Sequence, residues 1–538
     1  MAYTPAPENQ TYSTEKIPAA YDIEMRPNSK FYSVASTTYQ DAGMINLLSR
    51  KEKDASGAVK IYADTRNPIQ GYEIVNSDLP MRGIYIWQKT PTTAYFYAVC
   101  GTGVYTSVDA ITWTLRDTLL TGTDRPVRFT EFISDTNVKS LILVDGVEGY
   151  VYTSNLAGTK IVSADFPTPH VPFPVVVNAR LYLAKAETGD IYNSNLNDPA
   201  LWTAGDFISS ELYPDDIQAL VKINNYLLAI GTQGSEFFYD AANITGSPLA
   251  RYDGGSLPFG TQIPNSIASN KNVVIMIANE NNGENSVKVI ENFQAKDIPS
   301  TFVVAALNHR LTTASNYVTA AAVRGYMFRQ HGSLYYGLAF QGDDTSSPVL
   351  INPSFAFSFD TGWWSELRHG ATGNAPFPVY FTGTALSYGI STFVGGHVGG
   401  SPFFGQMKEG AHNTFTATAE DNIIDGAGSS VIYVELRTPN IDCGTSNLKT
   451  MHRFGVKVTE STSSTSTSGA PLTLSVSYSD DDYATYSTAR DLVFGASLKF
   501  PFLTQLGAFR QRSFKITYAS TSFLRFSEIE MDINKGQQ

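Results

Sequence analysis

The sequence is poor in cysteine and in charge, and each scarcity excludes a class of protein. Of its 538 residues only Cys100 and Cys443 are cysteines, which excludes a disulfide framework and a cysteine-based zinc site. A reducing compartment fits this usage best. Charged residues make up 16% of the chain, against about 25% in an average soluble protein, and this deficit argues against long charged helices.

Basic residues are outnumbered by acidic ones, and the formal net charge is -12. A protein that wraps nucleic acid needs clustered lysines and arginines, because binding depends on counterion release from the phosphates. The composition therefore argues against such a protein. It does not argue against a channel through which DNA passes, since an acidic channel wall repels the phosphates and so prevents the DNA from binding to it.

Long apolar runs are missing as well. No stretch of about 18 apolar residues occurs anywhere in the chain. The N-terminal "MAYTPAPENQTYSTEK" has neither a basic n-region nor an apolar h-region. We therefore expect no secretory signal and no membrane anchor.

The common catalytic motifs are also absent. The sequence contains no Gly-x-Ser-x-Gly, His-Glu-x-x-His, Cys-x-x-Cys or Gly-Lys-Ser/Thr motif, so it offers no nucleophile elbow, metal pair or phosphate loop. The pairs Asp215–Asp216 and Asp343–Asp344 lie in turn-like stretches, and adjacency does not place two carboxylates across a cleft. We expect a protein that is not an enzyme and has no cofactor, and we nominate no catalytic, cofactor-binding or metal-binding residue.

Aromatic residues and glycine are plentiful, with 30 Tyr, 31 Phe and 42 Gly. They recur in a hairpin pattern. Each copy begins with a run of aromatic and β-branched residues, continues through a gap that contains glycine, and ends with a second such run. Four copies are clear: "TAYFYAVCGTGVYTS", "KSLILVDGVEGYVYTS", "NARLYLAKAETGDIYNS" and "NNYLLAIGTQGSEFFYD". Tyr105, Tyr152 and Tyr192 in the first three are 47 and 40 residues apart, close to the roughly 40 to 50 residues of a propeller blade.

Three looser copies follow before residue 420. The pattern predicts an all-β fold with a β-propeller of about six to eight blades over residues 81–420. A few short helices interrupt it near residues 299–323. There Ser300 can cap "PSTFVVAALNHRL", Val303, Leu307 and Leu311 share one helical face, and "TASNYVTAAAV" can form a second helix.

The two ends of the chain differ from this rhythm. Residues 421–538 contain runs such as "PLTLSVSYSDDDYATYS" and "FKITYASTSFLRFSEIEMDI", which predict a C-terminal β-sandwich-like domain. Residues 1–80 are interpreted as an N-terminal arm or platform segment, within which "MINLLSRKEK" is helical in character.

Two loops share a turn chemistry. "SVDAITWT" resembles the Asp-box turn of many propellers, with Ile111 at the usual glycine, and we expect Asp109 to accept backbone N–H bonds while Trp113 packs beneath the hairpin. The loop "GDIYNSNLNDPALW" repeats the arrangement, with Ser194 after a strand and Trp202 as the packed aromatic. Both loops are interpreted as structural.

Three further features have a functional and a structural interpretation. Asp480, Asp481 and Asp482 could bind a hard cation, but a solvated turn is favoured because neighbouring side chains rarely converge. Trp363 and Trp364 in "GWWSEL" face opposite sides of a strand. One fills a blade core, and for the other we favour packing over stacking on a partner or sugar.

The order of these landmarks resembles a known family, the podovirus tail nozzle or tail hub, also called packaged DNA stabilization protein. The resemblance rests on "NARLYLAKAETGDIYNSNLNDPALW", "ELYPDDIQALVKINNYLLAIGTQGSEFFYDA", "STFVVAALNHRL", "YMFRQHGSLYYGLAF" and "FSFDTGWWSEL". It extends to "LTLSVSYSDDDYATYS" and "LGAFRQRSFKITY" near the C-terminus. Asp482-Tyr483 replaces the Gly-Gly that usually follows the aspartates.

The resemblance implies a structural virion protein of a short-tailed bacteriophage, made in the host cytoplasm and located at the distal end of the tail. Such a subunit forms a homohexameric ring that continues the portal and adaptor channel, retains packaged DNA and gates its ejection. Its implied partners are the tail adaptor (the head-to-tail connector), a tail fibre or spike, and transiting double-stranded DNA, which it does not bind sequence-specifically.

Two alternatives remain open from the residues alone. One is an Asp-box propeller hydrolase that cleaves glycans, which needs an arginine cluster and acidic residues converging at one propeller mouth. The other is a tail component that binds glycans through surface aromatics without cleaving them.

Overall fold

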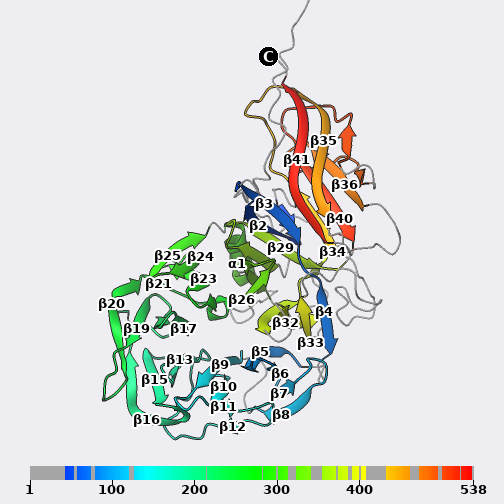
Figure 1. The fold of residues 1–538 in the computed structure, drawn as a ribbon. Helices are drawn as coiled ribbons and strands as arrows, with labels where there is room; N and C mark the ends of the chain where they lie inside the picture. Colours follow the sequence, from blue (N-terminus) through cyan, green and yellow to red (C-terminus); the bar gives the residue numbers. More distant parts are fainter. Residues whose placement is uncertain are drawn as a thin grey trace, which may run out of the picture.

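The structure, a computed structural model, is a ring of β-sheets joined to a second β-domain (Figure 1). The described residues are 43–53, 57–73, 79–119, 126–213, 215–280, 283–298, 301–312, 323–340, 354–370, 373–385, 391–398, 401–407, 432–460, 472–494, 500–520 and 523–535. Almost all of the secondary structure in these ranges is strand. The all-β prediction is therefore confirmed.

The described strands form seven propeller blades, each built on an antiparallel sheet that starts at the centre of the ring. The first four blades follow one another in the sequence. Blade 1 consists of β5 (Met81–Thr90), β6 (Thr93–Cys100), β7 (Gly103–Ser107) and β8 (Thr114–Thr118); blade 2 of β9 (Arg128–Ile133), β10 (Lys139–Val144), β11 (Gly149–Tyr152) and β12 (Thr159–Lys160); blade 3 of β13 (Val175–Val177), β14 (Arg180–Ala184), β15 (Asp190–Asn195) and β16 (Asp198–Ser209); blade 4 of β17 (Ala219–Ile223), β18 (Tyr226–Ile230), β19 (Ser235–Asp240) and β20 (Leu249–Leu257).

The remaining three blades are less regular. Blade 5 consists of β21 (Phe259–Gly260), β22 (Ala268–Asn270), β23 (Val273–Glu280), β24 (Asn285–Glu291) and β25 (Gln294–Ile298); blade 6 of β26 (Val323–Gln330), β27 (Ser333–Phe340), β28 (Ser354–Ser358) and β29 (Trp364–His369), with β30 (Ala375–Pro376) beside β29; blade 7 of β31 (Val379–Ala385), β32 (Ser391–Val398), β33 (Ser401–Met407) and β4 (Ile69–Glu73). The seven hairpin repeats of the sequence thus correspond to the seven blades.

The ring closes through a strand from the N-terminal part of the chain. The innermost strands contact one another in the order β5, β9, β13, β17, β22, β26 and β31, and β31 returns to β5. The outermost strand of blade 7 is β4, which pairs antiparallel with β33. The propeller is therefore closed by pairing the beginning of the described chain with its last blade.

The hydrophobic cores lie between neighbouring blades, because both faces of each blade are apolar and each face packs against the adjacent blade. Tyr97 of blade 1 meets Tyr152 of blade 2 edge to face, with 5.2 Å between ring centroids. Phe96 of blade 1 meets Phe393 of blade 7 at 4.9 Å. Such edge-to-face pairs add to the stabilisation from buried area, and they account for the aromatic richness of the sequence.

One α-helix lies in the described residues, α1 (Thr301–Thr312). It follows blade 5, and Val303 and Leu307 are buried in one cluster with Ile277 of blade 5 and Trp364 of blade 6. The helix predicted in this stretch is present, and it fills the space between two blades. The side chain of Leu311, Ser300 and the second expected helix lie outside the described residues.

The C-terminal domain is a sandwich of two sheets. One contains β2 (Leu47–Lys53), β3 (Val59–Thr65), β41 (Leu524–Lys535), β35 (Lys449–Glu460), β38 (Phe502–Thr504) and β39 (Ala508–Phe509); the other contains β1 (Gly43–Ile45), β34 (Ile432–Arg437), β40 (Ser513–Ser520), β36 (Leu472–Ser479) and β37 (Arg490–Phe494). Phe454 and Phe514 stack between the sheets with centroids 3.9 Å apart. The predicted sandwich-like domain is confirmed.

Propeller and sandwich share a sheet. Strand β1 pairs in parallel with β29 of blade 6 and antiparallel with β34 of the sandwich. Blade 6 and one sandwich layer therefore form a single 10-stranded sheet. Because backbone hydrogen bonds run across this junction, the two domains are joined far more firmly than by a linker.

The expectation of helical character for "MINLLSRKEK" is wrong, since this stretch forms β1 and β2. Leucine, lysine and glutamate favour helices intrinsically, but tertiary pairing overrides such weak preferences. Here β2 pairs along its length with β3, and Arg50 Nε donates to Asp64 Oδ2 at 2.6 Å. The described part of residues 1–80 contributes β1, β2 and β3 to the sandwich and β4 to the propeller, and β1 also joins blade 6.

Candidate functional site

The Asp-box turn of blade 1 is a structural element. Asp109 Oδ1 accepts the backbone N–H groups of Ile111 at 2.9 Å and Thr112 at 2.7 Å, and also the Ser107 hydroxyl at 2.8 Å. These bonds to the carboxylate lower the pKa of Asp109 to about 2. Trp113 is buried against blade 7. The predicted role of the motif is confirmed, and its carboxylate is occupied by the turn.

Residues 196–197 connect β15 to β16, and the first residues of β16, up to Trp202, are structural as well. Asp198 Oδ1 accepts the N–H of Ala200 at 2.9 Å, and Trp202 Nε1 donates to the carbonyl oxygen of Pro199 at 3.1 Å. The indole meets Phe166 edge to face at 5.4 Å. The interpretation of Trp202 as a packed aromatic is confirmed.

The three consecutive aspartates near the C-terminus diverge. Asp480 forms a two-pronged ion pair with Arg512 at 2.6 and 2.7 Å. Asp481 accepts from Ser479 and from Thr485, and these bonds lower its pKa to about 2. Asp482 accepts from an asparagine on a neighbouring loop. With each carboxylate directed to a different partner, the turn interpretation holds.

Other acidic candidates do not converge either. Asp215 Oδ2 accepts the backbone N–H groups of Gln233 at 2.5 Å and Gly234 at 3.1 Å, so it fixes the turn between β18 and β19. Asp343 and Asp344 lie outside the described residues. Within the part of the chain that the structure describes, no group of three His, Cys, Asp or Glu side chains is placed to hold a metal ion.

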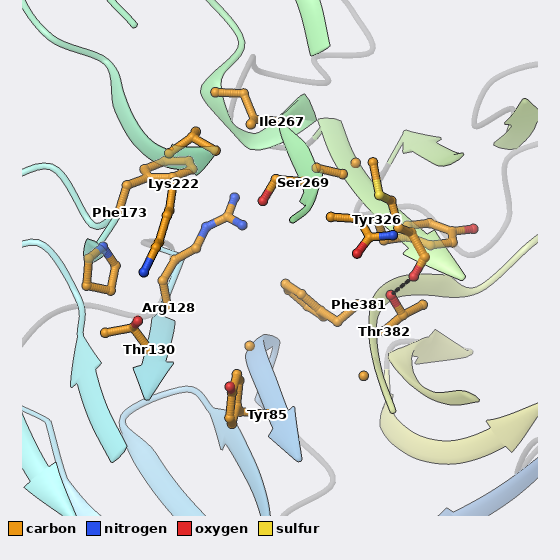
Figure 2. A pocket seen from close by; sticks show the side chains of 18 of the residues that line it. Tyr85, Arg128, Thr130, Phe173, Lys222, Ile267, Ser269, Tyr326, Phe381 and Thr382 are labelled. Atoms are coloured by element: carbon orange, nitrogen blue, oxygen red, sulfur yellow. Dashed lines mark hydrogen bonds between the residues drawn. The ribbon is translucent and has the colours of Figure 1, made fainter. Parts of the chain in front are cut away.

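The propeller channel gathers charged groups that the sequence leaves scattered. It contains a cavity of about 880 Å³ lined by residues of the innermost strands (Figure 2). Five charged side chains lie among the described lining residues: Arg128, Glu131, Lys222, Arg324 and Arg329. The channel of this acidic chain is thus rich in cations.

Arg128 extends from β9 toward the middle of the cavity (Figure 2). Its guanidinium carbon lies 4.2 Å from the ring centroid of Phe173, and Nη2 donates to Asn265 Oδ1 at 3.3 Å. Desolvation lowers the pKa of Arg128 to about 10. Both of these partners are neutral, so no carboxylate of the described residues compensates its charge.

Arg324 lies on β26, in the same cavity. It is only 6% exposed, and its guanidinium carbon lies 5.8 Å from the ring centroid of Phe381. Burial, together with repulsion from Arg128, lowers the pKa of Arg324 to about 9. An arginine is normally protonated well above this value, so the group stays charged near neutral pH at an energetic cost.

One acidic group faces the same space. Glu131 Oε1 accepts the hydroxyl of Tyr85 at 3.0 Å. Burial and this carboxylate raise the pKa of Tyr85 above its usual range, so the phenol stays protonated. Glu131 is the one carboxylate among the described lining residues, whereas cleavage of a glycoside usually needs two.

The cluster of cations in the channel was not predicted, because its members come from three blades: Arg128 from β9, Lys222 from β17, and Arg324 and Arg329 from β26. Only ring closure brings β9, β17 and β26 together. A usable signal is nevertheless present in "ALVKI" and "VRGYMFRQ", where a cation interrupts the apolar first strand of a repeat. Such a residue on an innermost strand must face either a neighbouring blade or the channel.

The fold and channel define a class, an all-β propeller fused to a sandwich and built mainly from structural motifs. A family model described as "Bacteriophage P22 Gp10, beta-propeller" matches residues 33–376, more than half of the chain. The chain belongs to this family of phage tail and DNA-stabilization proteins, and the resemblance found in the sequence is confirmed. The family is structural, which makes the protein a virion component.

Solved structures with propeller folds are similar at low identity. BBS1N in complex with ARL6DN is 10% identical with a TM-score of 0.38, over 64% of this chain and 98% of that one. A virginiamycin B lyase from Staphylococcus aureus is 11% identical with a TM-score of 0.37, over 63% and 99%. No curated protein matches the chain. Among the described residues, no helix is long and apolar enough to cross a membrane.

Proposed function

We propose that this protein is the tail nozzle or hub subunit of a short-tailed phage. Six copies form a ring at the distal end of the tail that continues the portal and adaptor channel, retains packaged DNA and gates its ejection. The observation that carries the proposal is the family match over a propeller that shares a 10-stranded sheet with a second domain. A subunit built this way transmits force between its domains without a flexible joint.

Exposed aliphatic side chains on blades 2 and 3 support a subunit interface. Val162 is 84% exposed and Leu201 is 50% exposed. Their sequence neighbours, Ser163 and Trp202, are joined by hydrogen bonds. Burying these two exposed side chains against another subunit would be favourable, and identical head-to-tail contacts close a ring.

The net charge of -12 supports a conduit role. Six acidic chains repel the phosphates of double-stranded DNA that passes between the subunits, outside the propeller channel of each subunit, and bind no particular sequence. In this proposal the partners are the tail adaptor and a tail fibre or spike, and the protein acts without catalysis. Its synthesis in the host cytoplasm is consistent with its two free cysteines.

The test is the mass of the purified protein, alone and mixed with the adaptor, followed by electron microscopy of virions. We expect a hexameric ring at the tail tip. Leu201→Glu should abolish the ring, while the matched control Leu448→Glu, on an exposed leucine of the sandwich, should leave it intact. A monomer that stays monomeric with the adaptor and is absent from the tail tip would contradict the proposal.

A glycan-cleaving or glycan-binding function is a second candidate. It is favoured by one observation, the Tyr85–Glu131 pair in a channel that also holds Arg128. If this alternative is correct, the protein should release sugar from host polysaccharide or bind glycans on an array. The Glu131→Gln variant should lose that activity. A protein that neither cleaves nor binds any host glycan would exclude it.

A further inference from the structure

Arg324 is a buried cation that no carboxylate of the described residues neutralises. Its Nε and Nη1 atoms have no hydrogen-bond partner among the described residues, and no carboxylate of the described chain pairs with it. Leaving a charge buried and unpaired is strongly destabilising. Arg324 lines an open cavity, and an anion bound in that cavity would compensate its charge.

A second cation faces the same cavity. Arg128 is close enough to Arg324 for their charges to repel, and within the described part of the chain its guanidinium contacts the ring of Phe173 and the amide oxygen of Asn265, both neutral. Lys222 and Arg329 add two more cations to the lining, against the single carboxylate Glu131. An excess of cations has therefore been concentrated in the channel of a chain whose net charge is -12.

The charge and shape of the guanidinium groups indicate the kind of anion. Arginine forms paired hydrogen bonds with the oxygens of carboxylates and phosphates. A carboxylate carries one negative charge and would neutralise one of the two arginines, whereas a phosphate near neutral pH carries up to two and can bridge both. The cavity of about 880 Å³ is large enough for a phosphate together with an attached group.

We infer that the channel of the propeller binds a phosphate group between Arg128 and Arg324. The phosphate is either free inorganic phosphate or the phosphate of a mononucleotide. In the second case the rings of Phe173, Phe381 and Tyr326, which also line the cavity, are available to contact the base. The site is independent of ring assembly, because its residues all come from one subunit.

Isothermal titration calorimetry of the full chain at constant ionic strength tests the inference, with inorganic phosphate, deoxyadenosine monophosphate and acetate as probes. We expect one phosphate site per chain. Arg324→Met and Arg128→Gln should each weaken it at least about tenfold, since a hydrogen bond to a charged group contributes about 1.5 to 3 kcal/mol. The control Arg490→Gln, on an exposed arginine of the sandwich, should bind as the wild type does.

A second readout separates binding from folding. Without phosphate, Arg324→Met should melt at the same temperature as the wild type or higher, because it removes an unpaired buried charge. Added phosphate should raise the melting temperature of the wild type but not of this variant. Tighter binding of the mononucleotide would identify a nucleotide as the ligand, and equal binding would identify free phosphate. No binding of either, tighter binding of acetate, or undiminished binding in both variants would overturn the inference.

Discussion

Trp363 and Trp364 are consecutive in the chain and are buried in different cores. Trp363 packs in the sandwich cluster around Phe454, whereas Trp364 packs in the cluster between blades 5 and 6, beside Tyr336 and Phe357. Trp363 directly precedes β29 and Trp364 is its first residue, so the two side chains enter the cores of two different domains where this strand begins. Both indoles are therefore packing residues, and neither is free to stack on a partner or a sugar.

This division predicts separable effects of two substitutions. Replacing a buried tryptophan with alanine costs about 3 to 5 kcal/mol through lost burial and the cavity left behind. We expect Trp363→Ala to increase amide hydrogen exchange mainly in β34, β35 and β40, and Trp364→Ala to increase it mainly in β23, β27 and β28. Identical exchange patterns for the two variants would contradict the assignment to separate cores.

Trp202 provides a second stability test with its own neighbour as the control. Trp202 is 3% exposed and Leu201 is 50% exposed. Thermal or urea unfolding should show Trp202→Ala to be less stable by about 3 to 5 kcal/mol, and Leu201→Ala to be within about 0.5 kcal/mol of the wild type. Equal effects would mean that β16 is not anchored in blade 3 through its buried tryptophan.

The propeller was predictable because its repeat is local. Each blade carries a hairpin whose two strands are close in sequence, and residues such as Tyr105, Tyr152 and Tyr192 recur at blade spacing. The closure by β4 was not predictable, since "IQGYE" is a five-residue strand without a distinctive pattern and its partner β33 is far along the chain. The strands in "MINLLSRKEK" were missed for a related reason, because their pairing partners override local preference.

The turns could be predicted from local sequence, whereas the charged channel could not. The chemistry of Asp109 was visible in the sequence, because its hydrogen-bond partners are two and three residues away. The proximity of Arg128 and Arg324 was not visible in the sequence, because it depends on the number of blades and on which residues face the channel. Local motifs therefore identified the fold, while the charged site required the assembled ring.

Gly325 follows Arg324 on β26 and permits a close approach of backbones. A Cβ atom at this position would lie 1.9 Å from the carbonyl oxygen of Ser266, so Gly325→Ala must displace β26 from blade 5. We expect it to destabilise the propeller by more than about 1 kcal/mol, as overpacking does. Gly205→Ala is the matched strand control, since nothing lies within 4 Å of its added Cβ. A Gly325→Ala protein that unfolds at the wild-type urea concentration would show that the strands can separate without cost.

His397 connects blade 7 to blade 1 and makes this contact sensitive to pH. Its Nε2 accepts the backbone N–H of Met81 at 2.6 Å, which requires a neutral ring. Burial, together with the nearby charge of Arg324, lowers the pKa of His397 from 6.5 to about 4. The folded pKa lies below the unfolded one, so the unfolded chain takes up the proton first as the pH falls.

The stability that His397 contributes is therefore present above about pH 6.5 and is lost as the pH falls toward about 4, by up to about 3 kcal/mol. Urea unfolding at several pH values between these limits measures the loss. His397→Gln should remove most of this slope, because glutamine can accept a hydrogen bond but does not titrate. His452→Gln, on an exposed histidine of the sandwich, should keep the slope, and a wild-type slope in His397→Gln would show that other groups set the pH dependence.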